Sequence, residues 1–244
     1  MPAAPQRSPT GLQYIEGAVS PALWGELQVW LVSDPQIPWE RAVEGRRVAQ
    51  WGYRYDYQVH DVDRTPVAPI PPALRKLIAR ETSRFTQCII NEYTASDGIP
   101  WHTDHPSFGP EILVFSFGAP RALLLRKPGV DGVDFSLKPQ HCSAYRLVGE
   151  ARNEWQHCVL GGPLAEGAAG IRYSMTFRSA AAWEEGTEHL ASLEPAAGQA
   201  PVSDLGAATT PLRAVEPPRG LMVGMYCRLE LLSPEKHAVR PRTK

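Results

Sequence analysis

Seven short runs of strand-forming residues between residues 87 and 180 constrain the fold of this chain most strongly. They read QCIINEYT, EILVFSFG, RALLLRKP, VDFSLKP, CSAYRLVG, EWQHCVL and RYSMTFRSA. Aromatic, aliphatic and β-branched residues dominate them, and turn signals such as Ser96-Asp97-Gly98 and Lys127-Pro128-Gly129 lie between them. Many short strands with such turns are typical of a β-sandwich or jelly roll. We therefore predict a mainly β fold with flanking helices.

Two helices and one aromatic strand are expected before these runs. Ser20 and Pro21 mark the start of a helix. Its apolar stripe consists of Leu23, Leu27, Trp30 and Leu31. A short amphipathic helix, ALRKLIARETSRF, follows the proline-rich connection DRTPVAPIPP. Between the helices, RRVAQWGYRYDYQVH has an aromatic residue at every second position from Trp51 to Tyr57, which predicts a strand with one aromatic face.

The composition changes towards both ends of the chain. Residues 1–11 are rich in proline and small residues, and we expect them to be disordered. One domain is predicted over residues 12–182. Residues 183–219 form a Pro/Ala-rich flexible linker in this interpretation. Residues 220–244 combine a possible late strand, GLMVGMYCRLELL, with a basic tail.

Charge and cysteine content narrow the functional classes. With 25 basic and 26 acidic residues the formal net charge is -1, so no global basic field indicates nucleic-acid or membrane binding, although a local basic groove is compatible with it. The four cysteines form no CxxC pair, which favours buried free thiols in a reducing compartment. No apolar stretch of about 18 residues is present, and the start MPAAPQRSPTG lacks the apolar core of a signal peptide. We expect a soluble monomer in the cytoplasm or nucleus.

The segment IPWHTDHPSFGPEI carries two histidines and an aspartate within four residues. On a strand, His102 and Asp104 would project from the same face. Two imidazoles and one carboxylate bind ferrous iron and leave coordination positions open for O2 and a co-substrate. His157, in NEWQHCVL, is the candidate for the third ligand because its neighbours resemble a core strand. The alternatives are a polar loop for His102 and Asp104, and a core histidine bonded to backbone for His157.

RYSMTFR places two arginines six residues apart, so a strand would direct Arg172 and Arg178 to one face, with Ser174 and Thr176 between them. Buried guanidinium groups are costly unless an anion meets them. A dicarboxylate fits, because guanidinium groups bind carboxylates through two parallel hydrogen bonds. An outward strand face covered by salt bridges explains the same pattern.

The order HxD, distal histidine, RxSxTxR resembles the AlkB-like family of Fe(II)- and 2-oxoglutarate-dependent dioxygenases. The resemblance covers residues 14–179 and is strongest from Asn91 to Arg178. NEYTASDGIPWHTD is similar to that family's N-x-Y segment leading into HxD, EILVFSFGAPRALLLR to its following core strands, and LVGEARNEWQHCV to the segment with its distal histidine. The resemblance implies a double-stranded β-helix, or jelly-roll, dioxygenase core over residues 12–182.

The resemblance also implies a cofactor and residue roles. Fe(II) would be held by His102, Asp104 and His157. Arg172 with Tyr93 would hold the distal carboxylate of 2-oxoglutarate, and Arg178 with Asn91 would lie near its metal-chelating end. O2 and 2-oxoglutarate would be consumed as co-substrates, giving succinate and CO2, while a C–H bond of the substrate is oxidised.

Four residues are candidates for substrate contact. HTDHPSFGPEI is more similar to the family members that act on tRNA wobble uridines than to the DNA-repair members. WGYRYDY occupies the region where the family builds its nucleotide-recognition lid, so Tyr53, Arg54 or Tyr55 is expected to contact a flipped base. His105 would face the substrate or support the metal ligands. The alternative for the aromatic residues is that they fill the core beneath the sheet.

Three classes of function follow from this interpretation. The first is a nucleic-acid oxidase that demethylates or hydroxylates a base in RNA, tRNA or single-stranded DNA. The second is the same oxidation of a protein or small molecule, which the neutral total charge keeps open. The third is a non-catalytic binding module, and the complete set of candidate ligands argues against it.

Overall fold

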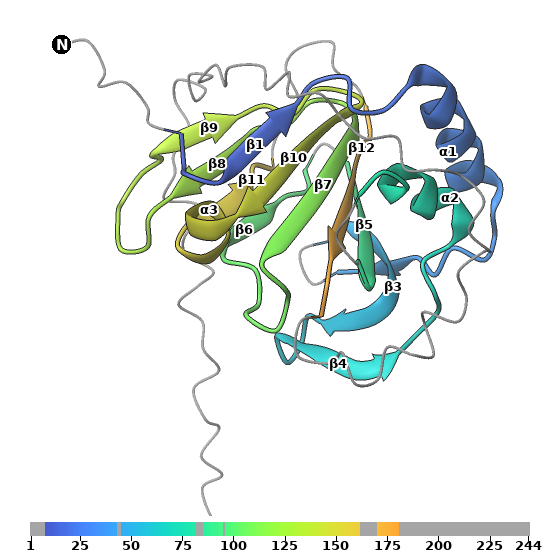
Figure 1. The fold of residues 1–244 in the computed structure, drawn as a ribbon, viewed down its shortest axis with the longest axis horizontal. Coiled ribbons are helices and arrows are strands. Elements are labelled where there is room, and N and C mark those ends of the chain that lie inside the picture. The colour runs from blue at the N-terminus through green and yellow to red at the C-terminus, as the bar shows by residue number, and fades with distance from the viewer. Residues whose placement is uncertain (1–7, 43–44, 82–84, 95, 162–169, 181–244) are drawn as a thin grey trace, which may run out of the picture.

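The computed structural model describes residues 8–42, 45–81, 85–94, 96–161 and 170–180. Its strands form two antiparallel sheets that lie against each other as a sandwich (Figure 1). The larger sheet consists of β1 (Leu12–Ile15), β10 (Ser143–Val148), β7 (Glu111–Gly118), β12 (Arg172–Arg178), β5 (Gln87–Tyr93), β3 (Arg47–Asp56), β2 (Glu40–Arg41) and β4 (Asp61–Pro66). The first seven strands are given in their spatial order, and β4 pairs with β3. The smaller sheet consists of β6 (Ile99–His102), β11 (Gln156–Val159), β8 (Leu123–Arg126) and β9 (Phe135–Leu137). Each of the seven predicted runs contains a strand, which confirms the mainly β, jelly-roll prediction.

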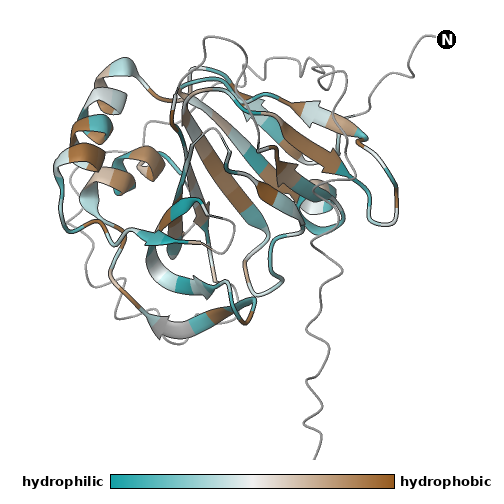
Figure 2. Cartoon of the chain, turned by 180° about the vertical axis from the view of Figure 1, so that it is seen from behind, coloured by the Kyte–Doolittle hydropathy of each residue, from teal (hydrophilic) through white to brown (hydrophobic). Residues whose placement is uncertain are grey.

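The two faces of β12 bury different kinds of residue. On β12, Met175 and Phe177 pack beneath the helices, in one cluster with residues of α1 (Pro21–Ser33) and α2 (Pro72–Arg75). Arg172, Ser174, Thr176 and Arg178 alternate with them and therefore face the smaller sheet. Figure 2 shows apolar residues on the two helices where they flank the sheet. The prediction that both arginines of RYSMTFR share one face is confirmed.

The first helix matches its sequence signals, whereas the second is shorter than expected. Ser20 caps α1 by accepting a hydrogen bond from the Leu23 amide at 3.2 Å. In the described part of ALRKLIARETSRF, which excludes residues 82–84, helical structure is limited to α2 and a 3-10 turn, Lys76–Ile78. Beyond that turn Glu81 forms an ion pair with Arg146 of β10 at 2.6 Å, so the chain is held against the sheet instead of continuing as a helix.

The single aromatic face expected for β3 is wrong, because Gly52 interrupts the period of two. Its φ of +76° is a left-handed conformation, and a Cβ at this position would lie 1.8 Å from the Thr86 carbonyl oxygen. Trp51, before the glycine, packs in the cluster beneath the helices. Tyr53, after it, packs in a separate cluster with Phe108.

The chain ends differ partly from expectation. Residues 8–11 belong to the segment expected to be disordered, yet the Gly11 carbonyl accepts a hydrogen bond from Val148 at 3.0 Å. The Thr10 carbonyl likewise accepts from the Ala151 amide of α3 (Gly149–Asn153) at 2.9 Å. The linker expected over 183–219 and the strand and tail expected over 220–244 lie outside the described residues. No helix in the described part of the chain has the length and apolar character to cross a membrane.

We predict that Gly52→Ala lowers the free energy of unfolding by at least about 2 kcal/mol, because the new Cβ meets both an unfavourable φ and the Thr86 carbonyl. Gly17→Ala is the matched control, since Gly17 also has positive φ, +64°, but has open space around it. Urea unfolding of both variants measures the difference. Equal losses would show that the close approach at Gly52 contributes nothing.

Candidate metal and co-substrate site

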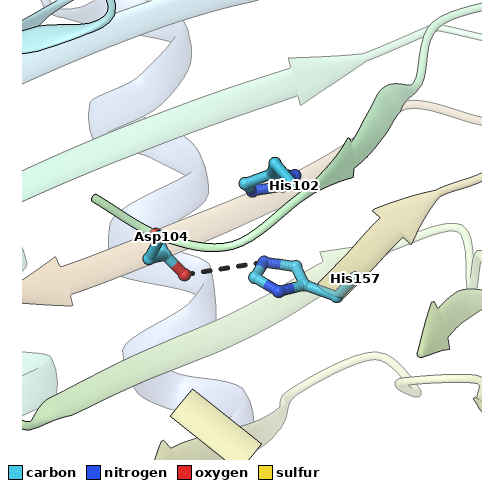
Figure 3. A group of neighbouring side chains, drawn as sticks. All are labelled: His102, Asp104 and His157. Atoms are coloured by element: carbon cyan, nitrogen blue, oxygen red, sulfur yellow. Dashed lines mark ion pairs between the residues drawn. The ribbon is translucent and has the colours of Figure 1, made fainter. Parts of the chain in front are cut away.

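Three candidate metal ligands converge between the sheets. His102 is the last residue of β6, and His157 is its direct cross-strand partner on β11, with ring centroids 4.2 Å apart. Asp104 lies in the loop just after β6 and points toward His157 (Figure 3). The ligand atoms of the three side chains all lie within 4.8 Å of one another. The expected strand through HxD ends at His102, so Asp104 reaches the histidines from a loop.

The protonation states of the histidines suit metal binding. Burial, together with the neighbouring His102, lowers the pKa of His157 to about 3. Burial also lowers the pKa of His102, although Asp104 acts in the opposite direction. His102 Nδ1 lies 2.9 Å from the Pro100 carbonyl, which can only accept, so Nδ1 donates and Nε2 keeps its lone pair. The 3.6 Å approach of His157 to Asp104 is therefore not a salt bridge at neutral pH, but a contact between a neutral imidazole and a carboxylate.

Asp104 is held as a carboxylate by the charge of Arg178. Burial alone would raise the pKa of Asp104, but Arg178, His157 and His102 outweigh burial and hold it well below its usual range. Arg178 Nη2 donates to Asp104 Oδ1 at 2.6 Å, which leaves Oδ2 facing His157. The Arg178 guanidinium also lies over the Phe108 ring, 4.8 Å from its centroid. Arg178 therefore orients the carboxylate as well as keeping it ionised.

A second, deeper guanidinium group has unused donors. Arg172 is 2% exposed, and its Nη2 donates to Ser116 Oγ at 3.1 Å. Its plane lies over the Tyr93 ring, 4.9 Å from the centroid. Arg172 Nε and Nη1 have no hydrogen-bond partner among the described residues. A buried cation with free donors is costly, so this position fits the carboxylate of a bound anion.

Small polar side chains lie between the arginines on the inner face. Across the sheet, Ser143 of β10 is aligned with Ser116, Ser116 with Ser174, and Ser174 with Asn91 of β5. Asn91 Nδ2 donates to Ser174 Oγ at 3.3 Å. Asn91 Oδ1 accepts from Arg46 Nε at 2.9 Å, so the described contacts connect Asn91 to Arg46 and not to Arg178. The row offers hydroxyl and amide groups instead of bulky apolar side chains.

Sequence reasoning missed three residues of this site. Ser116 could have been found, because it is the polar residue at an inward position of the apolar run EILVFSFG. Tyr145 is buried beside Arg172 and Tyr93; burial raises its pKa. Its alternation with Leu147 on β10 was a usable signal. Arg152, which bonds to the backbone of the Asp104 loop, had no signal because the loop's path is set by the fold.

The structure brings together two of the four candidate substrate residues. Tyr55 and His105 lie near each other, with ring centroids 6.4 Å apart, and Asp104 and Arg178 are among the charges that act on the Tyr55 hydroxyl. Tyr53 is instead 2% exposed inside a cluster. Arg54 forms an exposed ion pair with Glu40 at 2.8 Å.

A cavity of about 400 Å³ adjoins Asp104. Its other lining residues are Thr103, Pro106, Phe108, Gly109, Pro110, Arg152 and Asn153.

Comparison with known proteins agrees with this geometry. The model of the 2OG-Fe(II) oxygenase superfamily matches residues 32–178. The chain is 32% identical over 160 residues to the tRNA (carboxymethyluridine(34)-5-O)-methyltransferase alkbh8 of Xenopus tropicalis, a match that covers 62% of this chain and 25% of that protein. The corresponding protein of Macaca fascicularis is 26% identical over 169 residues, covering 64% of this chain and 25% of the relative.

A solved structure shares the fold. The structure of OsALKBH1 superimposes with a TM-score of 0.54 at 16% sequence identity, covering 71% of this chain and 98% of that chain. The matched family model spans more than half of the present chain, whereas the matches to the curated relatives span a quarter of their length. The chain therefore belongs to the 2OG-Fe(II) oxygenase superfamily, which uses Fe(II) as cofactor and 2-oxoglutarate and O2 as co-substrates, and it shares the fold of OsALKBH1.

Proposed function

We propose that His102, Asp104 and His157 bind the ferrous iron of this dioxygenase. The observation that carries the proposal is the convergence of two neutral imidazoles and one ionised carboxylate on a single point between the sheets. Three protein ligands on one side of an ion leave the other coordination positions for co-substrates, which is the arrangement that non-haem iron oxygenases need. Bound iron supplies the activation of O2 for oxidation of a C–H bond.

The co-substrate is proposed to occupy the space between the two arginines. Arg172 offers two unpartnered donors to the distal carboxylate of 2-oxoglutarate, and the Tyr93 ring lies against the same guanidinium. Arg178 contacts the proposed iron ligand Asp104, so the chelating end of 2-oxoglutarate would lie at this arginine, with Asn91 proposed to contribute from the polar row beside Ser174. A dicarboxylate with one end at the iron and the other at Arg172 fits both features.

The proposed substrate is a modified or alkylated base in nucleic acid. RNA or tRNA is favoured over single-stranded DNA as the nucleic acid. The names of the two relatives described above refer to carboxymethyluridine at tRNA position 34, which supports this substrate class. Tyr55 and His105 form an aromatic wall beside Asp104 that suits stacking on an unpaired base. Nucleic acids and this chain's buried thiols both fit the cytoplasm or nucleus as its compartment.

A protein or small-molecule substrate is the second candidate. Acidic residues favour it, because Asp61 lies 3.6 Å from His105 at the same wall, and Asp56 is aligned with Asp61 across the β3–β4 hairpin. These carboxylates would repel a phosphate backbone passing close to them. The two candidates are separated by the substrate that stimulates turnover.

The proposed function is tested by succinate formation from 2-oxoglutarate under air with Fe(II) and ascorbate. Purified protein is assayed alone, with total tRNA and with methylated single-stranded DNA. We expect turnover that tRNA stimulates and that His102→Ala abolishes. Turnover indifferent to both nucleic acids would favour the second candidate, whereas unchanged turnover in His102→Ala would refute the proposed iron ligands.

We predict that Arg172→Met weakens 2-oxoglutarate binding by at least about 30-fold, since a charged hydrogen-bonded partner is removed. The ligand-free variant should melt at the wild-type temperature or above it, because an unpaired buried cation is replaced by an apolar side chain. Calorimetric titration with Mn(II)-loaded protein and thermal melting measure the two effects. Arg126→Met, which alters a guanidinium stacked on Trp101 of the smaller sheet, is the control and should leave 2-oxoglutarate affinity unchanged. A large loss of ligand-free stability in Arg172→Met with intact 2-oxoglutarate binding would indicate a structural role instead.

We predict that Tyr55→Ala weakens tRNA binding by about 1–3 kcal/mol, which is roughly 5- to 150-fold, by removing a stacking surface, while iron binding and melting temperature stay near wild type. Tyr53→Ala should instead lose about 3 kcal/mol or more of unfolding free energy, because its ring is buried in a cluster. Gel-shift assays at low and high salt, with parallel urea unfolding, make the comparison. If both variants lost stability equally, Tyr55 would be a core residue.

A further inference from the structure

Arg152 is a buried cation that the proposed chemistry does not use. It lies on α3, five positions before His157, and is 4% exposed. Its Nη1 donates to the Asp104 carbonyl at 3.0 Å, and its Nη2 donates to the carbonyls of His105 and Phe108 at 2.8 and 3.2 Å. Burying a guanidinium against three neutral carbonyls of one loop has an unfavourable desolvation free energy. This cost indicates that the conformation of the loop is important for function.

The loop needs such support because Asp104 lies beyond the end of β6. His102 is fixed by the cross-strand ladder to β11, but Asp104 has no ladder partner. Arg178 holds the Asp104 side chain from the larger sheet. Arg152 binds the Asp104 main-chain carbonyl, so both the side chain and the backbone of Asp104 are held in place.

α3 also carries the chain into the strand of His157. Thr103 Oγ1 donates to the Trp155 carbonyl at 3.5 Å, a second link between the two ligand-bearing segments. The Trp155 indole donates to Glu150 at 3.1 Å, and Lys127 forms an ion pair with Glu150 at 2.8 Å. Arg152 therefore extends from an anchored helix to the Asp104 loop.

We propose that Arg152 is a positioning residue for the metal site: its three hydrogen bonds set the distance from the Asp104 carboxylate to His102 and His157. The inference rests on the proposed roles of these three residues as iron ligands. The same bonds hold His105 and Phe108 in place at the mouth of the site. Arg152 acts on metal binding through the backbone of the Asp104 loop.

The test is the affinity of full-length protein for Co(II) alone, with the visible d–d absorption of the bound ion as a second readout. Arg152→Ala should bind Co(II) at least about tenfold more weakly, as happens when residues that orient metal ligands are removed, and its spectrum should change. Arg152→Lys keeps the charge but carries its donors on a single nitrogen, whereas two guanidinium nitrogens reach the three carbonyls, so this variant should remain weakened. Full rescue by lysine would mean that charge rather than position matters, and would overturn the proposal.

Arg121→Ala is a closely matched control. Arg121 is likewise 4% exposed and donates to three backbone carbonyls, those of Thr94 and Asp97 before β6 and that of Leu160 just after β11, in segments without a proposed ligand. Its Co(II) affinity and spectrum should stay within about twofold of wild type, even if stability falls. Wild-type Co(II) affinity in Arg152→Ala, or equal losses in the alanine variants of Arg152 and Arg121, would refute the inference. His102→Ala separates this result from the proposed function: if it binds Co(II) normally, the ligand assignment itself fails.

Discussion

The buried ion pair between Asp104 and Arg178 is the interaction on which the site depends, because it joins the two sheets at the point where the candidate metal ligands meet. Asp104 follows the smaller sheet's β6, and Arg178 ends β12 of the larger sheet. Removing either partner would leave an uncompensated buried charge, which costs about 3–5 kcal/mol in comparable pairs. The pair also directs the second carboxylate oxygen toward His157.

Charge explains the deeper part of the site. Asp104 and Arg178 neutralise each other, the two histidines are neutral, and Arg172 remains as a cation with two unused donors. A divalent cation and a dicarboxylate bring equal and opposite charge, so both could bind without further imbalance, and one carboxylate would meet Arg172. The row of serines ending at Asn91 avoids bulky side chains beside this position. These polar and charged groups make the ligand-free protein less stable than an apolar interior would, as is common at ligand-binding sites.

Much of this arrangement follows from periodicity in the sequence. Strand patterns predict the main strands, and the even spacing of Arg172 and Arg178 predicts that they share one face, although only the fold shows that this face is the inner one. The sequence also predicts His157 as the third candidate ligand, and the structure aligns it with His102. In contrast, the left-handed backbone at Gly52 depends on the close approach of Thr86, a tertiary contact that no local pattern reveals. The full burial of Tyr53 beside a partly buried Tyr55, the end of β6 before Asp104 and the hydrogen bonds from Arg152 to the Asp104 loop also depend on segments distant in sequence.

The measurement that tests the central claim most directly is the visible spectrum of the protein with Fe(II), titrated with 2-oxoglutarate in the absence of oxygen. Chelation of ferrous iron by the keto acid produces a metal-to-ligand charge-transfer band. We predict that the band appears and saturates at one 2-oxoglutarate per chain, and that it is lost in His157→Ala and requires far more 2-oxoglutarate in Arg172→Met. Iron bound by wild-type protein without such a band, or a band that persists in His157→Ala, would contradict a shared iron and 2-oxoglutarate site between the sheets.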